Sequence, residues 1–241
     1  MDWFAEWFNT PYYHILYKNR DNKEAQEFIT NLLKYLSVST EDKILDLACG
    51  KGRHSIFLNK LGYDVVGVDL ASQSIESAKK SKNDRLKFFV GDMREVNFPH
   101  EFDAIFNLFT SFGYFSEEDD NLKVYQAVFE QLKEEHGIFV MDFMNAALAE
   151  HDLVEKEDKE VDGILFHLHR KVENNFIIKD INFTDQGKDF HYQEKVKAFK
   201  LNYFEQLGEQ VGFSLKNVFG DYQLNDFDEK RSPRLILIFE K

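Results

Sequence analysis

The chain has 241 residues, with 43 acidic and 30 basic side chains and a formal charge of −13. This charge disfavours nucleic-acid partners, because phosphate backbones are also negative and no basic stripe offsets the repulsion. The single cysteine, Cys49, excludes an internal disulfide and a cysteine-cluster metal site. No apolar run is long enough for a membrane span, and the first residues lack the pattern of a signal peptide. We therefore expect a cytoplasmic protein, a monomer or homodimer, with no nucleic-acid or membrane partner.

The first half of the chain alternates between strand and helix patterns after an aromatic lead-in. Apolar residues at helical spacing predict a first helix over 21–36. The segments that follow are strand 43–48, helix 54–61, strand 64–69, helix 73–81, strand 86–91, strand 103–108, helix 117–134 and strand 137–142. Such alternation predicts a parallel sheet covered by helices on both faces.

The pattern changes near residue 150. A charge-rich connection over 150–162 is followed by three strand-like runs, separated by the turn signals Asn174-Asn175 and Gln186-Gly187. A helix over 202–212 and strands over 215–222 and 234–240 close the chain.

These patterns predict an α/β fold with a doubly wound, mostly parallel sheet. The expected organisation is a single domain over 1–241. Residues 1–36 would form an N-terminal cap segment, and residues 150–200 an inserted antiparallel subdomain of three strands.

A glycine turn, "ILDLACGKGRHSIFL" over 44–58, follows the first strand. Gly50 and Gly52, with Asp69 nineteen residues after Gly50, could belong to a dinucleotide fingerprint, but Ser55 replaces its third glycine. Asp46 at the end of the strand suits a positively charged ligand and would repel a pyrophosphate. Both nucleotide-type ligands remain open on this motif alone.

The next two strands also end in carboxylates, at Asp69 and Asp92. The carboxyl ends of parallel strands share the edge at which open α/β sheets bind ligands. Asp69 can accept both hydroxyls of a ribose, and Asp92 can accept from an exocyclic amine. Met93 or Leu70 can lie on a purine face.

The ordered set "ILDLACGKGRHS", "VVGVDLA" and "FFVGDMRE" resembles the class I S-adenosylmethionine-dependent methyltransferases, over residues 40–142. The resemblance implies a Rossmann-like sheet of seven strands with the last strand pair reversed. It also implies S-adenosylmethionine as cofactor, no metal, and methyl transfer to nitrogen or oxygen of a small-molecule acceptor. It also implies that Asp46 and the backbone of Ala48–Gly52 hold the methionine portion, Asp69 the ribose, and Asp92 with Met93 the adenine. The catalytic residue stays unidentified.

Aromatic residues leave the fourth strand in "FDAIFNLFTSFGYF", over 102–115. We expect Asn107, at the strand end, and Phe109 to contact the cofactor. Phe112 and Tyr114 are candidates for the wall around the acceptor, through apolar and cation–π contact. The segment also resembles small-molecule methyltransferases, some of which methylate amino groups on sugars.

A second aromatic stretch, "PYYHILYKNR" over 11–20, is expected to close over the site. Tyr13 and Tyr17 share one face if the stretch is helical, with Tyr17 assigned to the cofactor and Tyr13 to the acceptor. His14 and Arg20 add a candidate base and a carboxylate-binding group.

Two other functions stay open on the sequence. An NAD-dependent Rossmann oxidoreductase would use the same glycine turn, and a regulator that binds the cofactor without turnover would have an identical site. His167 and His169 share a strand face, but two ligands make a poor metal site.

Overall fold

The computed structural model describes residues 3–18, 22–95 and 97–241. Its main sheet has seven strands in the order β10-β11-β5-β4-β1-β2-β3. The strands are β1 (Lys43–Leu47), β2 (Asp64–Asp69), β3 (Leu86–Val90), β4 (Ala104–Asn107), β5 (Ile138–Met144), β10 (Ser214–Phe219) and β11 (Arg234–Glu240). Strands β1 to β5 are parallel, and β11 runs antiparallel to both of its neighbours. The predicted seven-stranded α/β sheet is confirmed.

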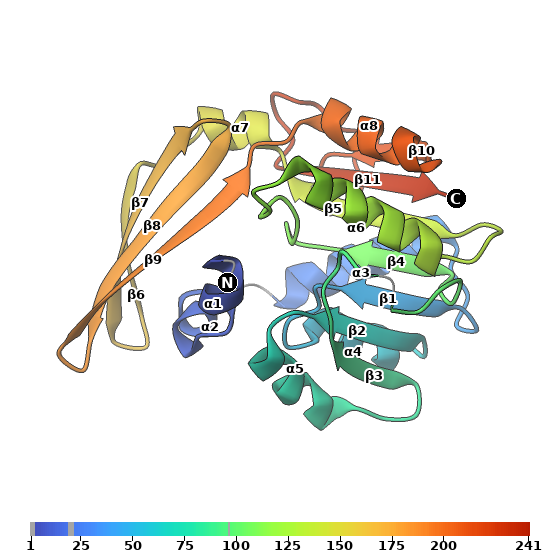
Figure 1. The fold of residues 1–241 in the computed structure, drawn as a ribbon, viewed down its shortest axis with the longest axis horizontal. Helices are drawn as coiled ribbons and strands as arrows, with labels where there is room; N and C mark the ends of the chain where they lie inside the picture. Colours follow the sequence, from blue (N-terminus) through green and yellow to red (C-terminus); the bar gives the residue numbers. More distant parts are fainter. Residues whose placement is uncertain (1–2, 19–21, 96) are drawn as a thin grey trace.

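Helices cover both faces of this sheet (Figure 1). The helical segments are α1 (Trp3–Phe8), α2 (Pro11–Leu16), α3 (Asn22–Leu36), α4 (Arg53–Lys60), α5 (Ser72–Ala78), the 3₁₀ turn η1 (Lys79–Ser81), α6 (Glu118–Gln131), α7 (Ala146–His151) and α8 (Leu201–Val211). Apolar side chains of α3, α4 and α5 pack on one face, and those of α6 and α8 pack on the other. The buried faces leave the carboxyl edge of the parallel strands for a ligand.

The inserted segment forms a separate antiparallel sheet in the order β6-β7-β8-β9. Its strands are β6 (Lys156–Val161), β7 (Ile164–Glu173), β8 (Phe176–Asp185) and β9 (Lys188–Lys197). Asn174-Asn175 and Gln186-Gly187 form the predicted turns, with φ of 50° and 63°, and of 48° and 73°. Left-handed φ at both turn residues is typical of two-residue hairpins.

The prediction of three inserted strands is wrong, because β6 is a fourth strand. It lies in the charge-rich stretch that we expected to be a connection, a loop or short helix, and it pairs with β7 across a turn at Asp162-Gly163. β6 is an edge strand with most of its side chains exposed. Charged residues are common on such edges, so the apolar alternation that marks a half-buried strand is missing.

Helices α1 and α2 lie between the two sheets in Figure 1. Trp7 and Leu16 are buried with residues of β6, β7 and β8 in a hydrophobic cluster of their own. The N-terminal helices therefore share a core with the inserted sheet. Within the described residues, no helix is both long and apolar enough to cross a membrane.

Candidate active site

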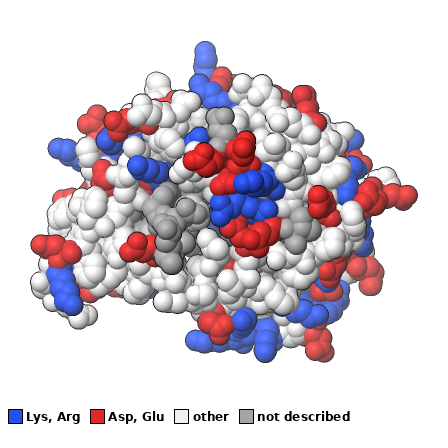
Figure 2. Space-filling model, in the orientation of Figure 1, with Lys and Arg blue, Asp and Glu red and all other residues white. Residues whose placement is uncertain are grey.

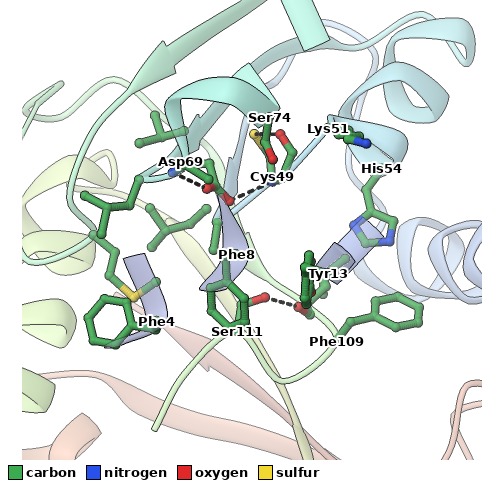
Figure 3. Close-up of a pocket in the computed structure, with 18 of the residues that line it drawn as sticks. Phe4, Phe8, Tyr13, Cys49, Lys51, His54, Asp69, Ser74, Phe109 and Ser111 are labelled. Atoms are coloured by element: carbon green, nitrogen blue, oxygen red, sulfur yellow. Dashed lines mark hydrogen bonds between the residues drawn. The ribbon is translucent and has the colours of Figure 1, made fainter. Parts of the chain in front are cut away.

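A cavity of about 450 Å³ opens at the carboxyl edge of β1, β2, β3 and β4. Figure 3 shows side chains from the sheet edge on one side and from α1 and α2 on the other. Ten of the predicted site residues line it: Tyr13, Tyr17, Ala48, Gly50, Asp69, Leu70, Asp92, Met93, Phe109 and Tyr114. The other four candidates, Asp46, Gly52, Asn107 and Phe112, do not line it.

The glycine turn after β1 has three residues in the left-handed region: Ala48 (φ 64°), Gly50 (φ 56°) and Gly52 (φ 77°). A Cβ on Gly50 would meet no atom within 4 Å, so its backbone faces open cavity. A Cβ on Gly52 would lie 2.6 Å from Cε1 of Phe88. Gly52 allows the turn to pack on β3, while Gly50 leaves room for a ligand against the backbone.

We expect Ala48→Gly to stabilise the fold, because Ala48 carries a Cβ in a conformation that costs a non-glycine residue about 1–2 kcal/mol. The greater freedom of glycine in the unfolded chain offsets part of this gain, which leaves up to about 1 kcal/mol. Urea unfolding of both proteins measures the difference. A variant less stable than the parent would contradict the expectation.

Asp69 connects the glycine turn to the end of β2. Its Oδ2 accepts from the backbone N–H of Gly50, and its Oδ1 from that of Ala71, both at 2.7 Å. Burial raises the pKa of Asp69, and the two backbone donors partly offset this. Each carboxylate oxygen of Asp69 accepts one of these hydrogen bonds and can accept another. Asp69 could therefore accept hydrogen bonds from two neighbouring hydroxyls of a ligand.

Asp92 is held by an arginine that the sequence analysis did not single out. Nε of Arg94 donates to Oδ1 of Asp92 at 3.0 Å, and Nη2 donates to Oδ2 at 2.6 Å. Arg94 also pairs with Asp120 at 2.7 Å and lies 4.7 Å from the ring centre of Phe115. Burial alone would raise the pKa of Asp92, but the Arg94 hydrogen bonds hold it below its ordinary value. Asp92 is therefore a charged, fixed acceptor at the cavity wall.

Asp46 does not line the cavity, contrary to the expectation. It is 1% exposed, and its Oδ2 accepts from the backbone N–H of Ser55 at 3.0 Å and from Ser55 Oγ at 2.5 Å. Asp46 thus supplies an acceptor to the first turn of α4, whose N-terminal donors need one. Ser55, at the position of the missing third glycine, is its partner. Burial raises the pKa of Asp46 to about 6.

This shift predicts how Asp46→Asn changes stability with pH. The folded pKa of about 6 exceeds the ordinary 3.8, so the proton stabilises the native state fully below pH 3.8 and no longer does so above pH 6. Asparagine does not titrate, so the variant does not lose stability as the parent does when Asp46 ionises. The unfolding free energy of the variant relative to that of the parent should therefore rise by up to about 3 kcal/mol between pH 4 and pH 7. Unfolding both proteins in urea across this range tests it, and parallel curves would contradict it.

Asn107, Phe112 and Gly52 also lie outside the cavity lining. Asn107 is fully buried, and its Nδ2 donates to the carbonyl of Leu47 at 3.1 Å, which ties β4 to β1. Phe112 is fully buried too and packs on Phe204 of α8, with ring centres 5.9 Å apart. Both side chains are therefore buried away from the cavity, which the sequence pattern does not determine.

The loop after β4 reaches the cavity in an unusual conformation. Phe109 and Thr110 are both left-handed, with φ of 60° and 59°. Asp142 of β5 accepts from the Phe109 N–H at 2.7 Å through Oδ2, and its backbone carbonyl accepts from the Thr110 N–H at 3.0 Å. Asp142 is fully buried and paired with Arg234 of β11 at 2.6 Å. This buried pair compensates for the strain of two left-handed residues.

The ring of Phe109 lies at one end of the cavity, in contact with two side chains of α4. The His54 ring stacks on it at 4.8 Å, and the Arg53 guanidinium lies 4.3 Å from its centre. Figure 3 shows Lys51, His54 and Phe109 on the side of the cavity away from Asp69. The cavity thus has a carboxylate end and an aromatic, basic end.

Helices α1 and α2 contribute aromatic rings to the cavity wall, and the candidates Tyr13 and Tyr17 are among them. The sequence analysis missed Phe4 and Phe8, which also line it, although the aromatic lead-in was a usable signal. Nε2 of His14 lies 3.4 Å from Oγ of Ser74. Burial, assisted by Lys51, lowers the pKa of His14 to about 4, so its imidazole is neutral at pH 7. The candidate Arg20 lies outside the described residues.

The cavity fits the cofactor that the sequence motifs imply. Gly50 offers open backbone, Asp69 offers acceptors beside it, and aromatic rings cover the opposite wall. In the described parts of the chain, no group of three or more His, Cys, Asp or Glu side chains is placed to hold a metal ion.

Comparisons with known proteins show what the chain is similar to. Residues 44–137 match the family model described as a methyltransferase domain. The putative methyltransferase YqeM of Bacillus subtilis is 29% identical over 205 residues, covering 78% of this chain and 81% of its own. An aminosugar N,N-dimethyltransferase of Streptomyces venezuelae, whose name specifies dTDP-3-amino-3,4,6-trideoxy-alpha-D-glucopyranose, is 25% identical over 87% of this chain and 90% of its own.

Among solved structures, an S-adenosylmethionine-dependent methyltransferase from Clostridium acetobutylicum superimposes with a TM-score of 0.79. It is 21% identical and covers 95% of each chain. The fold is therefore that of the class I methyltransferases. The chain carries a methyltransferase domain over residues 44–137, and along most of its length it is similar to S-adenosylmethionine-dependent methyltransferases.

Proposed function

We propose that the protein transfers a methyl group from S-adenosylmethionine to an amino nitrogen of a small-molecule acceptor. The observation that carries this proposal is the two-sided cavity. Its sheet edge presents backbone and carboxylate acceptors, and its other wall is made of aromatic rings from α1, α2 and the loop after β4. The relative named for a sugar amine supports nitrogen as the acceptor atom.

The cofactor, when bound, supplies a methyl group already activated on a sulfonium. The turn from Ala48 to Gly52 would hold its amino-acid portion, Asp69 its ribose, and Asp92 with Met93 its adenine. The protein then has to orient the acceptor and exclude water, and orientation of this kind can supply about 7–11 kcal/mol. Rings at the far end, such as Phe109 and Tyr13, would stabilise a cationic group by cation–π contact.

The surface charge also supports a small acceptor over a nucleic acid. On the face drawn in Figure 2, Lys and Arg side chains lie singly or in small groups beside Asp and Glu side chains. Within the described residues of that face, no continuous basic track follows a path that a phosphate backbone could occupy.

Calorimetry and isotope transfer test the proposal. S-adenosylmethionine and S-adenosylhomocysteine should bind, whereas NADH should not. Radioactivity from methyl-labelled S-adenosylmethionine should pass to one of a panel of amino acids and aminosugars. NADH binding more tightly than S-adenosylmethionine would favour an oxidoreductase. Cofactor binding without transfer to any amine, alcohol or phenol in the panel would favour a regulator.

A further inference from the structure

A buried ion pair lies where the N-terminal helices meet the inserted sheet. Lys179 of β8 and Glu194 of β9 have side chains only 16% and 13% exposed, with Nζ 2.6 Å from Oε2. Nε1 of Trp7 donates to Oε1 of Glu194 at 2.8 Å, and the Tyr17 hydroxyl lies 2.8 Å from both of its oxygens. Lys179 also donates to the Tyr17 hydroxyl. One carboxylate thus collects donors from α1, from the end of α2 and from β8.

Glu194 is charged in this environment. Burial alone would raise its pKa, but Lys179 and the hydrogen bonds from Trp7 and Tyr17 hold it below the ordinary value. A buried charge of this kind is tolerated only while its partners remain in place. The cluster therefore specifies one arrangement of α1 and α2 on the sheet.

The residues held by this cluster belong to the cavity wall. Tyr17 lines the cavity itself, and Trp7 packs on Tyr13, which also lines it, with ring centres 5.7 Å apart. Trp7 and Leu16 are buried against the inserted sheet. The position of the aromatic wall is thus set by β8 and β9, which contribute no residue to the cavity lining.

We propose that Glu194, paired with Lys179, is a positioning residue for methyl transfer: it fixes Tyr17 and helices α1 and α2 over the cofactor. The proposal rests on the proposed function, because the cavity has to be the cofactor site. The inserted sheet then acts as the support of the wall that closes the site.

Tryptophan fluorescence offers a direct readout of this wall. The chain has two tryptophans, and both belong to α1, which has the sequence WFAEWF. Emission therefore reports only on this helix. Glu194→Gln keeps the size of the side chain and an acceptor for Trp7, but it removes the charge that compensates Lys179.

We expect Glu194→Gln to shift the emission to the red and to weaken S-adenosylhomocysteine binding about tenfold, with little change in far-UV circular dichroism. Adding Lys179→Met should restore most of the affinity, because it removes the uncompensated charge. Asp162→Asn is the matched control. It breaks the exposed pair between Lys18 and Asp162, at 2.7 Å, which joins the same two segments at the surface.

The Asp162→Asn control should have the same tryptophan emission and the same affinity for S-adenosylhomocysteine as the parent. The proposal is overturned if folded Glu194→Gln has parental emission and affinity, or if Asp162→Asn has the same effect. Should Glu194→Gln fail to fold, Tyr17→Phe takes its place. It keeps the ion pair and should weaken binding several-fold in a protein with parental far-UV circular dichroism, and parental binding overturns the proposal. If the parent protein binds no S-adenosylhomocysteine, both the proposed function and the role of Glu194 are contradicted. If the parent binds it but the variants behave as the parent does, only the role of Glu194 is contradicted.

Discussion

Replacing Asp69 by alanine is expected to weaken S-adenosylhomocysteine binding by about 2–4 kcal/mol, which is about 30- to 900-fold. The variant loses the acceptor that we assign to the ribose hydroxyls. It also loses the acceptor for the N–H groups of Gly50 and Ala71, so the glycine turn is less well held. Calorimetric titration of the parent and the variant measures the effect.

Asp64→Ala is the matched control, because Asp64 begins the same strand at its opposite end. It should leave the affinity unchanged. Asp69→Asn should also bind weakly, because its two oxygens accept from different N–H groups and an amide NH₂ cannot replace both. Parental affinity in a folded Asp69→Ala protein would show that the ribose lies elsewhere.

Replacing Arg234 by methionine is expected to destabilise the fold by about 3–5 kcal/mol, the usual cost of leaving a buried charge without its partner. Asp142 is fully buried and loses both guanidinium hydrogen bonds, at 2.6 and 2.8 Å. The pair also anchors Phe109 and Thr110, so binding of the cofactor should weaken with stability. Urea unfolding at pH 7 provides the measurement.

The stability lost in Arg234→Met should depend on pH. Burial raises the pKa of Asp142 and Arg234 lowers it, so removing Arg234 raises it further. A carboxyl whose folded pKa exceeds its unfolded value stabilises the native state when protonated and loses that contribution as the pH rises. The variant should therefore recover stability relative to the parent on acidification, and a pH-independent loss would contradict this assignment.

Arg231→Met is the control for this experiment. Arg231 pairs with Asp228 three residues earlier, with a side chain that is 83% exposed. Surface pairs of this kind contribute about 0–1 kcal/mol, so the control should remain close to the parent at every pH. Equal losses in the two variants would show that burial of Asp142 is not the cause.

The sequence by itself determined the order of the strands in the main sheet and of the helices between them, the glycine turn, and the positions of Asp69 and Asp92 at or just after strand ends. These features depend on local physics: the spacing of apolar residues, the conformational freedom of glycine, and the parallel direction that alternating strands and helices impose. The hairpin turns at Asn174-Asn175 and Gln186-Gly187 were predictable for the same reason.

The tertiary structure alone decided where individual polar side chains point. Asp46 lies one residue before the end of β1 and Asp69 ends β2, yet Asp46 turns to Ser55 while Asp69 reaches the cavity. The direction depends on which helix packs beside each strand. Glu194 and Tyr17 meet across 177 positions of the chain, a contact that only the packing of the N-terminal helices on the inserted sheet creates. Strand β6 forms by hydrogen bonding to the free edge of β7. An edge strand with exposed side chains needs no alternation of apolar residues, so the sequence does not reveal it.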